Sequence, residues 1–593
     1  MPAATSNSAN RWLHYGILVL LALAVANLLA WRSIEPDLWG HIQYGEDWIH
    51  AGAMPTTASH TYSTPDHPWV NHENLFELAV AVGQRTLGGL GLMVLKCAAG
   101  LWLLWLMIRS AAAHDVPMVV AAVAMLPVAA GLGEFWLMRP QLFSFLFCGV
   151  LLFSLDKAFR NWQSSWSVDW KWLILCVPVM VLWTNAHGGF AAGLCVLLAV
   201  LGLRGIEFVL HRRKITKHHD DSTTVPNLRT LLYLGCIGLA SIAAIFVNPY
   251  GWELPYWMWM SLKQPRPEVS EWATIFEGGG VIVPFFTLCI LSIVATVWTK
   301  QKRDWVQIVV LGLIAVQAIG HLRHLAFFAI AFGFWMPVHI HSLWQQIVKW
   351  RPSLGQSQET SPLATRLLIG EFLLVAGGLA GILGYTFANF GVDRSKYPVS
   401  AFEYMADEQL EGRLVVTFNW AQYALAALAP TTTVGFDGRY DTCYPQTVVD
   451  MNFDLLFGQD LSRRHRGPDS GPVDSNRVLE FGNPNLVLLD RIADPPAVQH
   501  LEQHPDWVPL YMDGLAGLWG RRTVYDDPSK STYLPPERRH LSDVVPAGIA
   551  HWPGFPDRTG KHAFSPDVAT AVAAQRQQAN DVSIQLVKQS QAN

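Results

Sequence analysis

A series of eleven long apolar runs constrains the fold of this chain more than any other feature. The runs are 15 to 23 residues long, close to the roughly 17 to 25 residues of an α-helix that crosses the hydrocarbon core of a bilayer. Only 15% of the residues are charged and 51% are hydrophobic. The sequence therefore predicts a mainly α, polytopic membrane protein of about eleven spans and excludes an ordinary soluble or nucleic-acid-binding domain. The runs lie at 14–31, 91–109, 116–133, 141–157, 171–185, 189–210, 229–247, 280–298, 305–320, 324–342 and 367–389.

Lysine and arginine residues are concentrated in alternate loops between these runs. Examples are Lys157 with Arg160, the basic stretch 204–217, and Lys300 with Arg303. The positive-inside rule assigns such loops, and with them the N-terminus, to the cytoplasm. An odd number of spans then places the loop 32–90 and the segment after residue 390 on the outer face.

The region after the last span predicts a small α/β domain, which we place at 391–525 and outside the cytoplasm. Short apolar runs alternate there with helix-like stretches, a rhythm typical of a parallel sheet. Residues 1–390 form the membrane domain in this scheme, and 526–593 form a mostly disordered polar tail with one weak helix at 566–590. The expected strands are 413–418, 433–436 and 485–489, and the expected helices are 420–429, 446–457 and 495–503.

The external loop 32–90 gathers ionisable residues beside the membrane, where such groups are costly and usually mark a site. A short helix that starts near Pro36 would place Asp37, His41 and Tyr44 on one face. Asp37 also suits a plain helix start. The full set of ionisable candidates in the loop is Glu35, Asp37, His41, Glu46, His72, Glu73 and Glu77.

His72 and Glu73 precede an amphipathic segment, 74–86, that is too polar for a comfortable span. They either cap that helix or supply a metal ligand or a base. A divalent cation held by His41, Glu46 or His72 is an open possibility, with an undetermined set of ligands.

A second group of polar residues lies at span ends that share the predicted outer face. Arg139, directly before Pro140, either reaches the headgroups or binds an anion at a helix start. Arg323 lies between two histidines at a short outer turn, against the positive-inside bias, which favours phosphate binding. The substrate-binding candidates of this group are Arg139, His187, Glu271, Arg323 and His324; for His187, a turn with Gly188 and Gly189 is the structural alternative.

The string GFDGRYD at 435–441 follows an expected strand. Asp437 and Arg439 form either a turn with a local ion pair or part of a site at the carboxyl edge of a parallel sheet. Both interpretations stay open at the level of sequence.

The order of these features resembles the GT-C superfamily of membrane glycosyltransferases: an acid just after the first span, external helices, many further spans and an outer α/β domain. The strings EPDLWGHIQYGEDWIHAGAMPTTASHTYS, HPWVNHENLFEL, RPQLFSF, WTNAHGGF, NPYGWEL, RHLAFF and GFDGRYD are similar to a group of bacterial membrane proteins. The resemblance extends from residue 13 to about residue 520. It implies an integral protein of the bacterial inner membrane.

The resemblance also implies an activity. Such enzymes transfer a sugar from a polyprenyl-phosphate or polyprenyl-diphosphate donor to a lipid, glycan or protein acceptor at the outer face. By that match Asp37 is the candidate base, with Glu35 as a less favoured substitute. His41 and Glu73 complete the expected catalytic set, while positive charge at Arg139, Arg323 and His324 would stabilise the leaving phosphate.

Two other classes of function fit parts of the sequence. A non-catalytic protein of cell-envelope assembly would show scattered loop residues with no shared site. A lipid or polysaccharide transporter would show charged or broken helices near the bilayer midplane and a repeat between halves.

Overall fold

A computed structural model describes residues 4–30, 34–218, 228–352, 361–557 and 564. The chain divides into two compact units. The helical unit comprises 1–33, 93–256 and 269–388, and the α/β unit comprises 34–92, 257–268 and 389–593. The expected weak helix at 566–590 lies outside the described residues.

Each of the eleven predicted spans contains an apolar helix. Among the residues that the structure describes, five helices are long and apolar enough to cross a membrane, and the pair α13 and α14, bent by 56°, passes the same test when taken together. The prediction of an integral membrane protein is confirmed at this level. The span helices are α1 (Ala4–Ala30), α3 (Asn74–Ala112), α4 (Met118–Gly133), α5 (Gln141–Phe159), α7 (Trp170–Thr184), α8 (Phe190–His218), α9 (Arg229–Ala244), α11 (Ile282–Trp298), α12 (Trp305–Gly320), α13 (Leu325–Trp335), α14 (Pro337–Trp350) and α15 (Pro362–Ala388).

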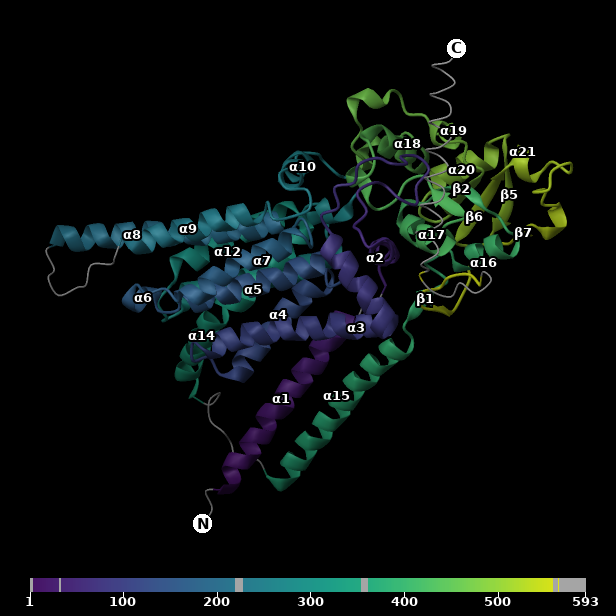
Figure 1. Ribbon diagram of the computed structural model, residues 1–593. Coiled ribbons are helices and arrows are strands. Elements are labelled where there is room, and N and C mark those ends of the chain that lie inside the picture. Colours follow the sequence, from purple (N-terminus) through teal and green to yellow (C-terminus); the bar gives the residue numbers. More distant parts are fainter. Residues whose placement is uncertain (1–3, 31–33, 219–227, 353–360, 558–563, 565–593) are drawn as a thin grey trace. The chain divides into compact units, whose positions relative to one another are not determined.

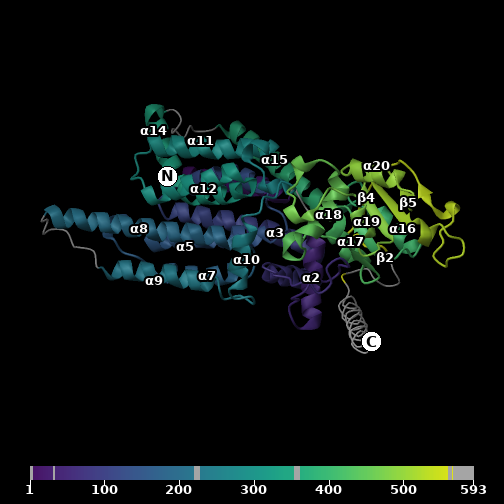
Figure 2. The same ribbon diagram turned by 90° about the horizontal axis from the view of Figure 1, so that it is seen from above.

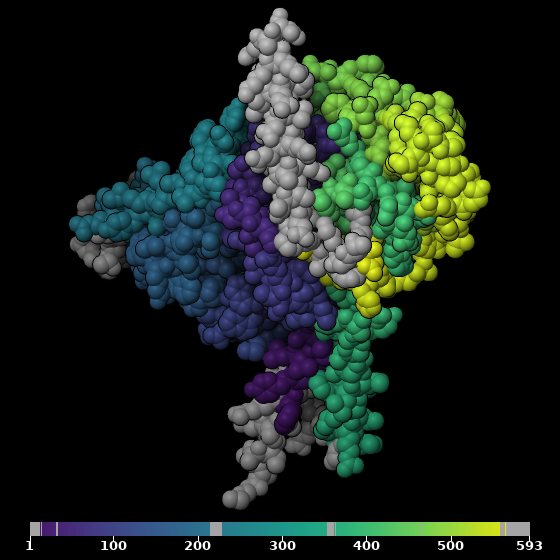
Figure 3. Space-filling view, turned by 45° about the vertical axis from the view of Figure 1, so that its right-hand side comes forward, coloured from purple at the N-terminus to yellow at the C-terminus, as the bar shows by residue number. Residues whose placement is uncertain are grey.

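Within the helical unit, neighbouring helices pack along their apolar faces. Helix α1 lies beside α15 and also contacts α4 (Figure 1). Helices α7, α8 and α9 form a second set of neighbours (Figure 2). Along its apolar window, α15 has no buried residues, and Figure 3 shows that the face of α15 turned to the viewer is uncovered. Such an apolar, uncovered surface is what a helix facing lipid presents.

Short helices connect the long ones. They are α6 (Trp162–Ser165), α10 (Glu253–Ser261), η1 (Ser270–Trp272), η2 (Ile275–Glu277), η3 (Gly279–Val281) and η4 (Leu322–His324). Among them, η1 and η4 contact each other.

Helix α3 is kinked at Gly88, whose φ of 66° lies in the left-handed region that glycine adopts without steric cost. The kink separates the expected amphipathic segment 74–86 from the expected span 91–109. The first part of α3 belongs to the α/β unit and the rest to the helical unit.

The α/β unit is built on a six-stranded sheet with the order β3-β2-β4-β6-β5-β7. Strands β2, β3 and β4 are parallel, as the βαβ rhythm predicts, and the three expected helices are present as α17, α18 and α20. The strands are β1 (Gly391–Asp393), β2 (Gly412–Val416), β3 (Thr432–Val434), β4 (Leu486–Asp490), β5 (Trp507–Met512), β6 (Ala516–Arg521), β7 (His540–Leu541) and β8 (Ile549–His551).

Six helices of at least four residues accompany these strands after residue 390. They are α16 (Val399–Asp407), α17 (Ala421–Leu428), α18 (Gln446–Phe457), α19 (Arg477–Glu480), α20 (Pro495–Gln503) and α21 (Arg522–Tyr525). The short 3-10 turns are η6 (Phe418–Trp420), η7 (Tyr440–Thr442), η8 (Leu461–Arg463), η9 (Pro468–Ser470) and η10 (Pro536–Arg538).

The strand directions in the second half of this sheet differ from the parallel sheet that the sequence predicts. Strand β6 runs antiparallel to both β4 and β5, so the sheet is mixed. The region 526–557, expected to be a polar tail, contributes β7 to this sheet and β8 to a two-stranded ladder with β1. These strands are two or three residues long, too short to leave a periodic pattern in the sequence.

The loop 34–92 groups with the α/β unit and not with the membrane helices, contrary to the expected boundary at residue 390. Thr61 bridges Val434 at the end of β3, and the backbone of Tyr62 donates to the Val434 carbonyl at 3.2 Å. Helix α2 (Leu38–Ala51) is anchored by Trp39, whose indole donates to the Pro553 carbonyl at 2.9 Å. The loop is therefore part of the α/β core.

Candidate functional site

Helices α2 and α3 bring the three expected catalytic residues into one cluster of the α/β unit. Asp37 precedes the first turn of α2, His41 lies one turn further on, and Glu73 precedes α3. Glu77, one turn into α3, joins them. Its carboxylate lies 3.5 Å from His41 Nδ1. We call Asp37, His41, Glu73 and Glu77 the loop cluster.

Asp37 is half-buried, whereas its neighbours Leu38 and Trp39 are fully buried. Its backbone N–H donates to the carboxylate of Glu35 at 2.9 Å, so Glu35 fixes the backbone of Asp37. Among the described residues, the Asp37 side chain does not accept the capping bonds of the first turn of α2. The plain cap interpretation of Asp37 therefore loses its main support.

His41 is buried and carries positive charge at neutral pH. Burial lowers its pKa, but the hydrogen bond with Glu77 and the charges of Glu73, Glu77 and Asp37 outweigh burial and raise the pKa to about 9. The Asn71 amide donates to the other Glu77 oxygen at 2.6 Å. These contacts hold the Glu77 carboxylate against His41.

His41, Glu73 and Glu77 have the geometry of a cation site. One ligand atom from each lies within 4.8 Å of the others. One imidazole nitrogen and two carboxylate oxygens form a donor set that suits Zn²⁺ or Mn²⁺. This set differs from the expected one, of which it keeps His41 only.

The other two expected ligands have different surroundings. Glu46 accepts hydrogen bonds from the Arg85 guanidinium at 2.5 to 2.9 Å, so its charge is already neutralised. His72 packs on the ring of Trp257, with 5.1 Å between centroids, and burial lowers its pKa to about 4. His72 is thus a neutral packing residue whose Nε2 lies 3.6 Å from Glu73.

In the helical unit, the turn η1 gathers most of the expected substrate-binding residues. Glu271 in η1 pairs with Arg139 at 2.5 Å, and Gln141 donates to the same carboxylate at 3.2 Å. The next residue, Trp272, lies under the Arg323 guanidinium at 4.6 Å from the ring centroid. We call Arg139, Glu271, Trp272 and Arg323 the η1 cluster.

His321 and His324 flank the η1 cluster through η4. The ring of His321 contacts Trp272 and that of His324 contacts His321 at 5.7 Å. Arginines held by an ion pair and by an aromatic face keep their charge in a fixed position, which suits recognition of a phosphate group.

His187 has the structural role that its sequence context also allowed. Its Nδ1 accepts a hydrogen bond from the Gly189 backbone N–H at 3.0 Å and lies 2.7 Å from the Ser144 hydroxyl. The side chain is 6% exposed. These contacts fix the turn between α7 and α8.

Sequence reasoning included Glu77 among the ionisable residues of the loop but gave it no role, and it missed Asn71 as the partner of Glu77. Glu73 and Glu77 are four residues apart at the start of α3, a spacing of one helical turn that could have identified the pair. The contact of Asn71 with Glu77 depends on the path of the loop before α3, which no local pattern specifies.

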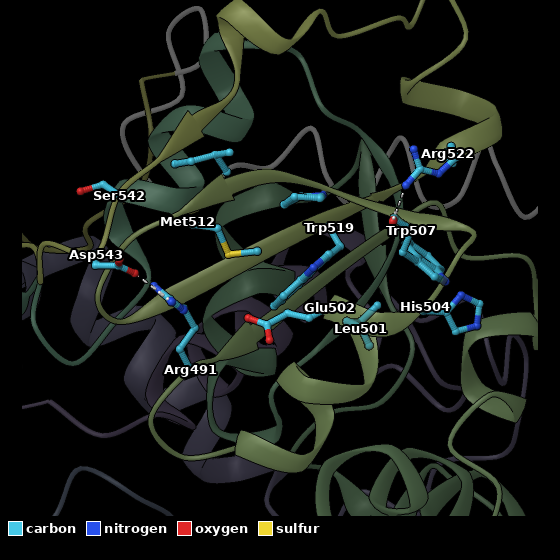
Figure 4. A pocket seen from close by; sticks show the side chains of 12 residues that line it. Arg491, Leu501, Glu502, His504, Trp507, Met512, Trp519, Arg522, Ser542 and Asp543 are labelled. Atoms are coloured by element: carbon cyan, nitrogen blue, oxygen red, sulfur yellow. Dashed lines mark hydrogen bonds and ion pairs between the residues drawn. The ribbon is translucent and has the colours of Figure 1, made fainter.

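A separate cavity of about 390 Å³ lies beside β5 and β6 (Figure 4). At one end Arg491 reaches Asp543 at 3.0 Å, and at the other end lie His504 and Arg522. The residues that line it fall between 491 and 543, so the cavity is distinct from the loop cluster.

No protein-family model matches the chain, and no curated protein matches it. Among solved structures, the chain is similar to the oligosaccharyltransferase AglB from Archaeoglobus fulgidus, in complex with an inhibitory peptide and a dolichol-phosphate. The TM-score is 0.50 at 10% identity over 84% of this chain and 73% of that chain. The structure of ArnT from Cupriavidus metallidurans bound to undecaprenyl phosphate is also similar, with a TM-score of 0.46 at 11% identity over 90% and 100% of the two chains. The fold of the chain is thus similar to that of the AglB oligosaccharyltransferase, and it agrees with the prediction of a mainly helical membrane domain with a C-terminal α/β region.

Proposed function

We propose that this chain is a membrane glycosyltransferase that transfers a sugar from a polyprenyl-phosphate or polyprenyl-diphosphate donor to a lipid, glycan or protein acceptor. The reaction takes place at the outer face of the bacterial inner membrane, with Asp37 as the base. The fold supports this proposal, because the AglB structure that shares it contains a dolichol-phosphate and a peptide.

The observation that carries the proposal is the loop cluster. It places a half-buried carboxylate, Asp37, next to a positively charged histidine and two further carboxylates. A carboxylate held in this way can accept the proton of an acceptor group as the group attacks the anomeric carbon of the sugar.

Charge stabilisation of the leaving phosphate is the second requirement of the reaction. In the helical unit, the η1 cluster offers Arg323 for this role. In its described contacts, the charge of Arg139 is neutralised by Glu271. We therefore assign Arg139 a positioning role: it holds η1, and so keeps Trp272 under the Arg323 guanidinium.

His41, Glu73 and Glu77 are the residues that would hold a divalent cation. When bound, such an ion supplies positive charge for a phosphate oxygen. Without it, the proton on His41 balances part of the negative charge of the two glutamates. Binding of the ion would displace that proton, so its affinity should rise with pH.

The experiment that tests the proposal compares lipid-linked sugars and glycoconjugates in membranes of the native host. The strains lack the chain or carry the wild type, Asp37→Asn or Arg323→Ala at matched levels. Asp66→Asn is the control, because Asp66 is an exposed carboxylate of the same loop outside the cluster, and its φ of 63° is one that asparagine tolerates.

We expect one glycoconjugate to disappear in the deletion strain and in both site variants while its lipid-linked precursor accumulates. The Asp66→Asn strain should match the wild type. Unchanged profiles in the deletion strain would contradict transfer activity and favour the assembly protein. A precursor that accumulates on the cytoplasmic face only would favour the transporter.

A further inference from the structure

We propose that the turn 435–441 of the α/β unit, GFDGRYD, positions the carboxylate of Asp37. This inference rests on the proposed function, since it concerns the residue to which we assign the role of base. It assigns a positioning role to Gly438, Asp437 and Arg439, which come from the opposite end of the sequence.

Gly438 provides the closest approach between the turn and the loop cluster. A Cβ atom at this position would lie 2.6 Å from Asp37 Oδ1 and 2.9 Å from Gln422 Nε2. Real Cβ atoms essentially never come so close to another heavy atom. The φ of Gly438 lies outside the left-handed region, so space, and not backbone conformation, requires glycine here.

The turn itself is fixed by a buried ion pair. The Arg439 guanidinium donates to the Asp437 carboxylate at 2.7 and 2.9 Å, and the two side chains are 3% and 0% exposed. The Tyr444 hydroxyl donates to the same carboxylate at 2.5 Å. Burial raises the pKa of Asp437, but Arg439 and these hydrogen bonds hold it below its usual range, so the pair is ionised at neutral pH.

Arg439 also binds the loop 34–92 directly. Its guanidinium donates to the Ser59 carbonyl at 2.6 Å and lies 4.7 Å from the ring centroid of Tyr44 and 5.1 Å from that of Trp69. Tyr44 is on α2, the helix that Asp37 precedes. A shift of Arg439 would therefore be transmitted to α2 and to Asp37.

Gln422 on α17 supports the same arrangement from a second side. Its Oε1 accepts a hydrogen bond from the Tyr44 hydroxyl at 2.9 Å. A Cβ atom on Gly40 would lie only 1.7 Å from this oxygen. Gln422 is thus enclosed between Gly40 of α2 and Gly438 of the turn, and Asp37 lies against the same turn.

These contacts explain why Asp437, Gly438 and Arg439 do not themselves form a binding surface. Asp437 and Arg439 are enclosed by the loop and cannot reach a substrate, while Gly438 has no side chain. The turn acts on the reaction through Asp37 alone. Its effect should therefore disappear when Asp37 is no longer a carboxylate.

A cross-linking experiment tests the juxtaposition without any assumption about activity. Asp37→Cys and Gly438→Cys are combined in the full chain and oxidised in membranes, and the bridged peptide is measured by mass spectrometry. A disulfide requires Cβ atoms about 3.5 to 4.5 Å apart. The control pair is Asp37→Cys with Gly467→Cys, at a glycine whose Cβ would contact Gln446, Asp450 and Ser470 instead.

We expect at least tenfold more cross-link in the first pair. Equal yields in the two pairs would overturn the inference whether or not the chain transfers sugar. Cys443 is buried, and the other six cysteines belong to the helical unit. A bridge to any of them would link other peptides, so mass spectrometry distinguishes it from the engineered bridge.

A kinetic experiment tests the positioning role, with the accumulated lipid-linked precursor as the donor. Gly438→Ala should lower kcat by about tenfold or more with little change in KM for the donor. Gly467→Ala, where the added Cβ would lie 2.9 Å from Gln446 Cγ, should change kcat less than twofold. In the Asp37→Asn background, Gly438→Ala should have no further effect. The same factor in both backgrounds, or a loss in Gly467→Ala equal to that in Gly438→Ala, would show a merely structural role. A wild-type rate in Asp37→Asn itself would instead remove the proposed function.

Discussion

The two compact units hold opposite kinds of charge in different ways. In the α/β unit, the loop cluster collects three carboxylates around one buried histidine, which stays protonated because of them. In the helical unit, the η1 cluster fixes two arginines with one carboxylate and one indole ring. Under the proposed function, the α/β unit would supply proton transfer and the helical unit would supply recognition of an anion. Mutations should therefore affect the roles of the two units separately.

The largest expected effect is on the transfer rate, and it tests whether Asp37 of the α/β unit acts in the reaction step or in binding of the donor. Asp37→Asn should lower the transfer rate by about 10²- to 10⁴-fold, the contribution of a general base. The affinity of the purified protein for undecaprenyl phosphate, measured by native mass spectrometry, should stay within about twofold, because the amide keeps the size of the carboxylate. A large loss of affinity in this variant would place anion binding in the α/β unit and break the comparison.

The next largest effect concerns the stability of the α/β unit. Asp437→Ala leaves the Arg439 guanidinium buried without its carboxylate, which should lower the free energy of unfolding by about 3–5 kcal/mol. Tryptophan fluorescence during denaturation of the purified protein measures this change. The control is Asp543→Ala, which breaks a pair with Arg491 whose aspartate is 90% exposed; a loss above about 1 kcal/mol there would contradict the distinction between buried and surface pairs.

The pH dependence of stability provides a third test of the loop cluster. The pKa of His41 is about 9 in the folded chain, above its ordinary value of 6.5. The stabilisation of the folded chain by protonated His41 is therefore complete below pH 6.5 and is lost as the pH rises to 9. The free energy of unfolding should fall by an amount on the order of 3 kcal/mol over this range. The midpoint of thermal unfolding of the wild type should fall over this range.

His41→Gln should remove that part of the slope between pH 6.5 and 9; it also removes the hydrogen bond and the charge that lower the pKa of Glu77. His72 contributes to the pH dependence of stability with the opposite sign. Its pKa of about 4 lies below the ordinary value, so its contribution is present above pH 6.5 and is lost as the pH falls to 4. A wild-type slope between pH 6.5 and 9 in His41→Gln would contradict the charge that we assign to His41.

The smallest expected effect lies in the helical unit. Arg323→Ala should weaken binding of undecaprenyl phosphate by about 10- to 100-fold, since a hydrogen bond to a charged group contributes about 1.5–3 kcal/mol. Arg351→Ala is the matched control, because Arg351 also stacks on a tryptophan, Trp350, at 5.4 Å, but lies outside the η1 cluster. Equal losses in the two variants would show general electrostatic attraction to the membrane instead of a specific site.

The sequence predicts the helical part of this fold well, because spans are long, apolar and local. All eleven predicted ranges contain a helix. The parallel strands β2, β3 and β4 could also be predicted, since each is followed by an amphipathic or apolar helix. The antiparallel strands β5 and β6 could not, because their pairing with β4 depends on contacts far apart in the chain.

The sequence points to the residue types of the candidate site but not to the contacts that these residues make in the fold. Asp37, His41 and Glu73 were chosen for their chemistry in one loop, and the fold brings them together. Glu46 was a reasonable metal ligand in the sequence, but Arg85, 39 residues away, neutralises it. The contact of Gly438 with Asp37 spans about four hundred residues, and only the folded chain reveals it.

The ladder between β1 and β8 has a mechanical consequence. Gly391, at the start of β1, pairs with His551, at the end of β8. Tension applied between α15 and residue 551 would therefore act on one end of this ladder before it reached the six-stranded sheet. Because the strands are antiparallel and are pulled from the same end, such a force opens their hydrogen bonds one after another. The ladder should therefore open before the six-stranded sheet does.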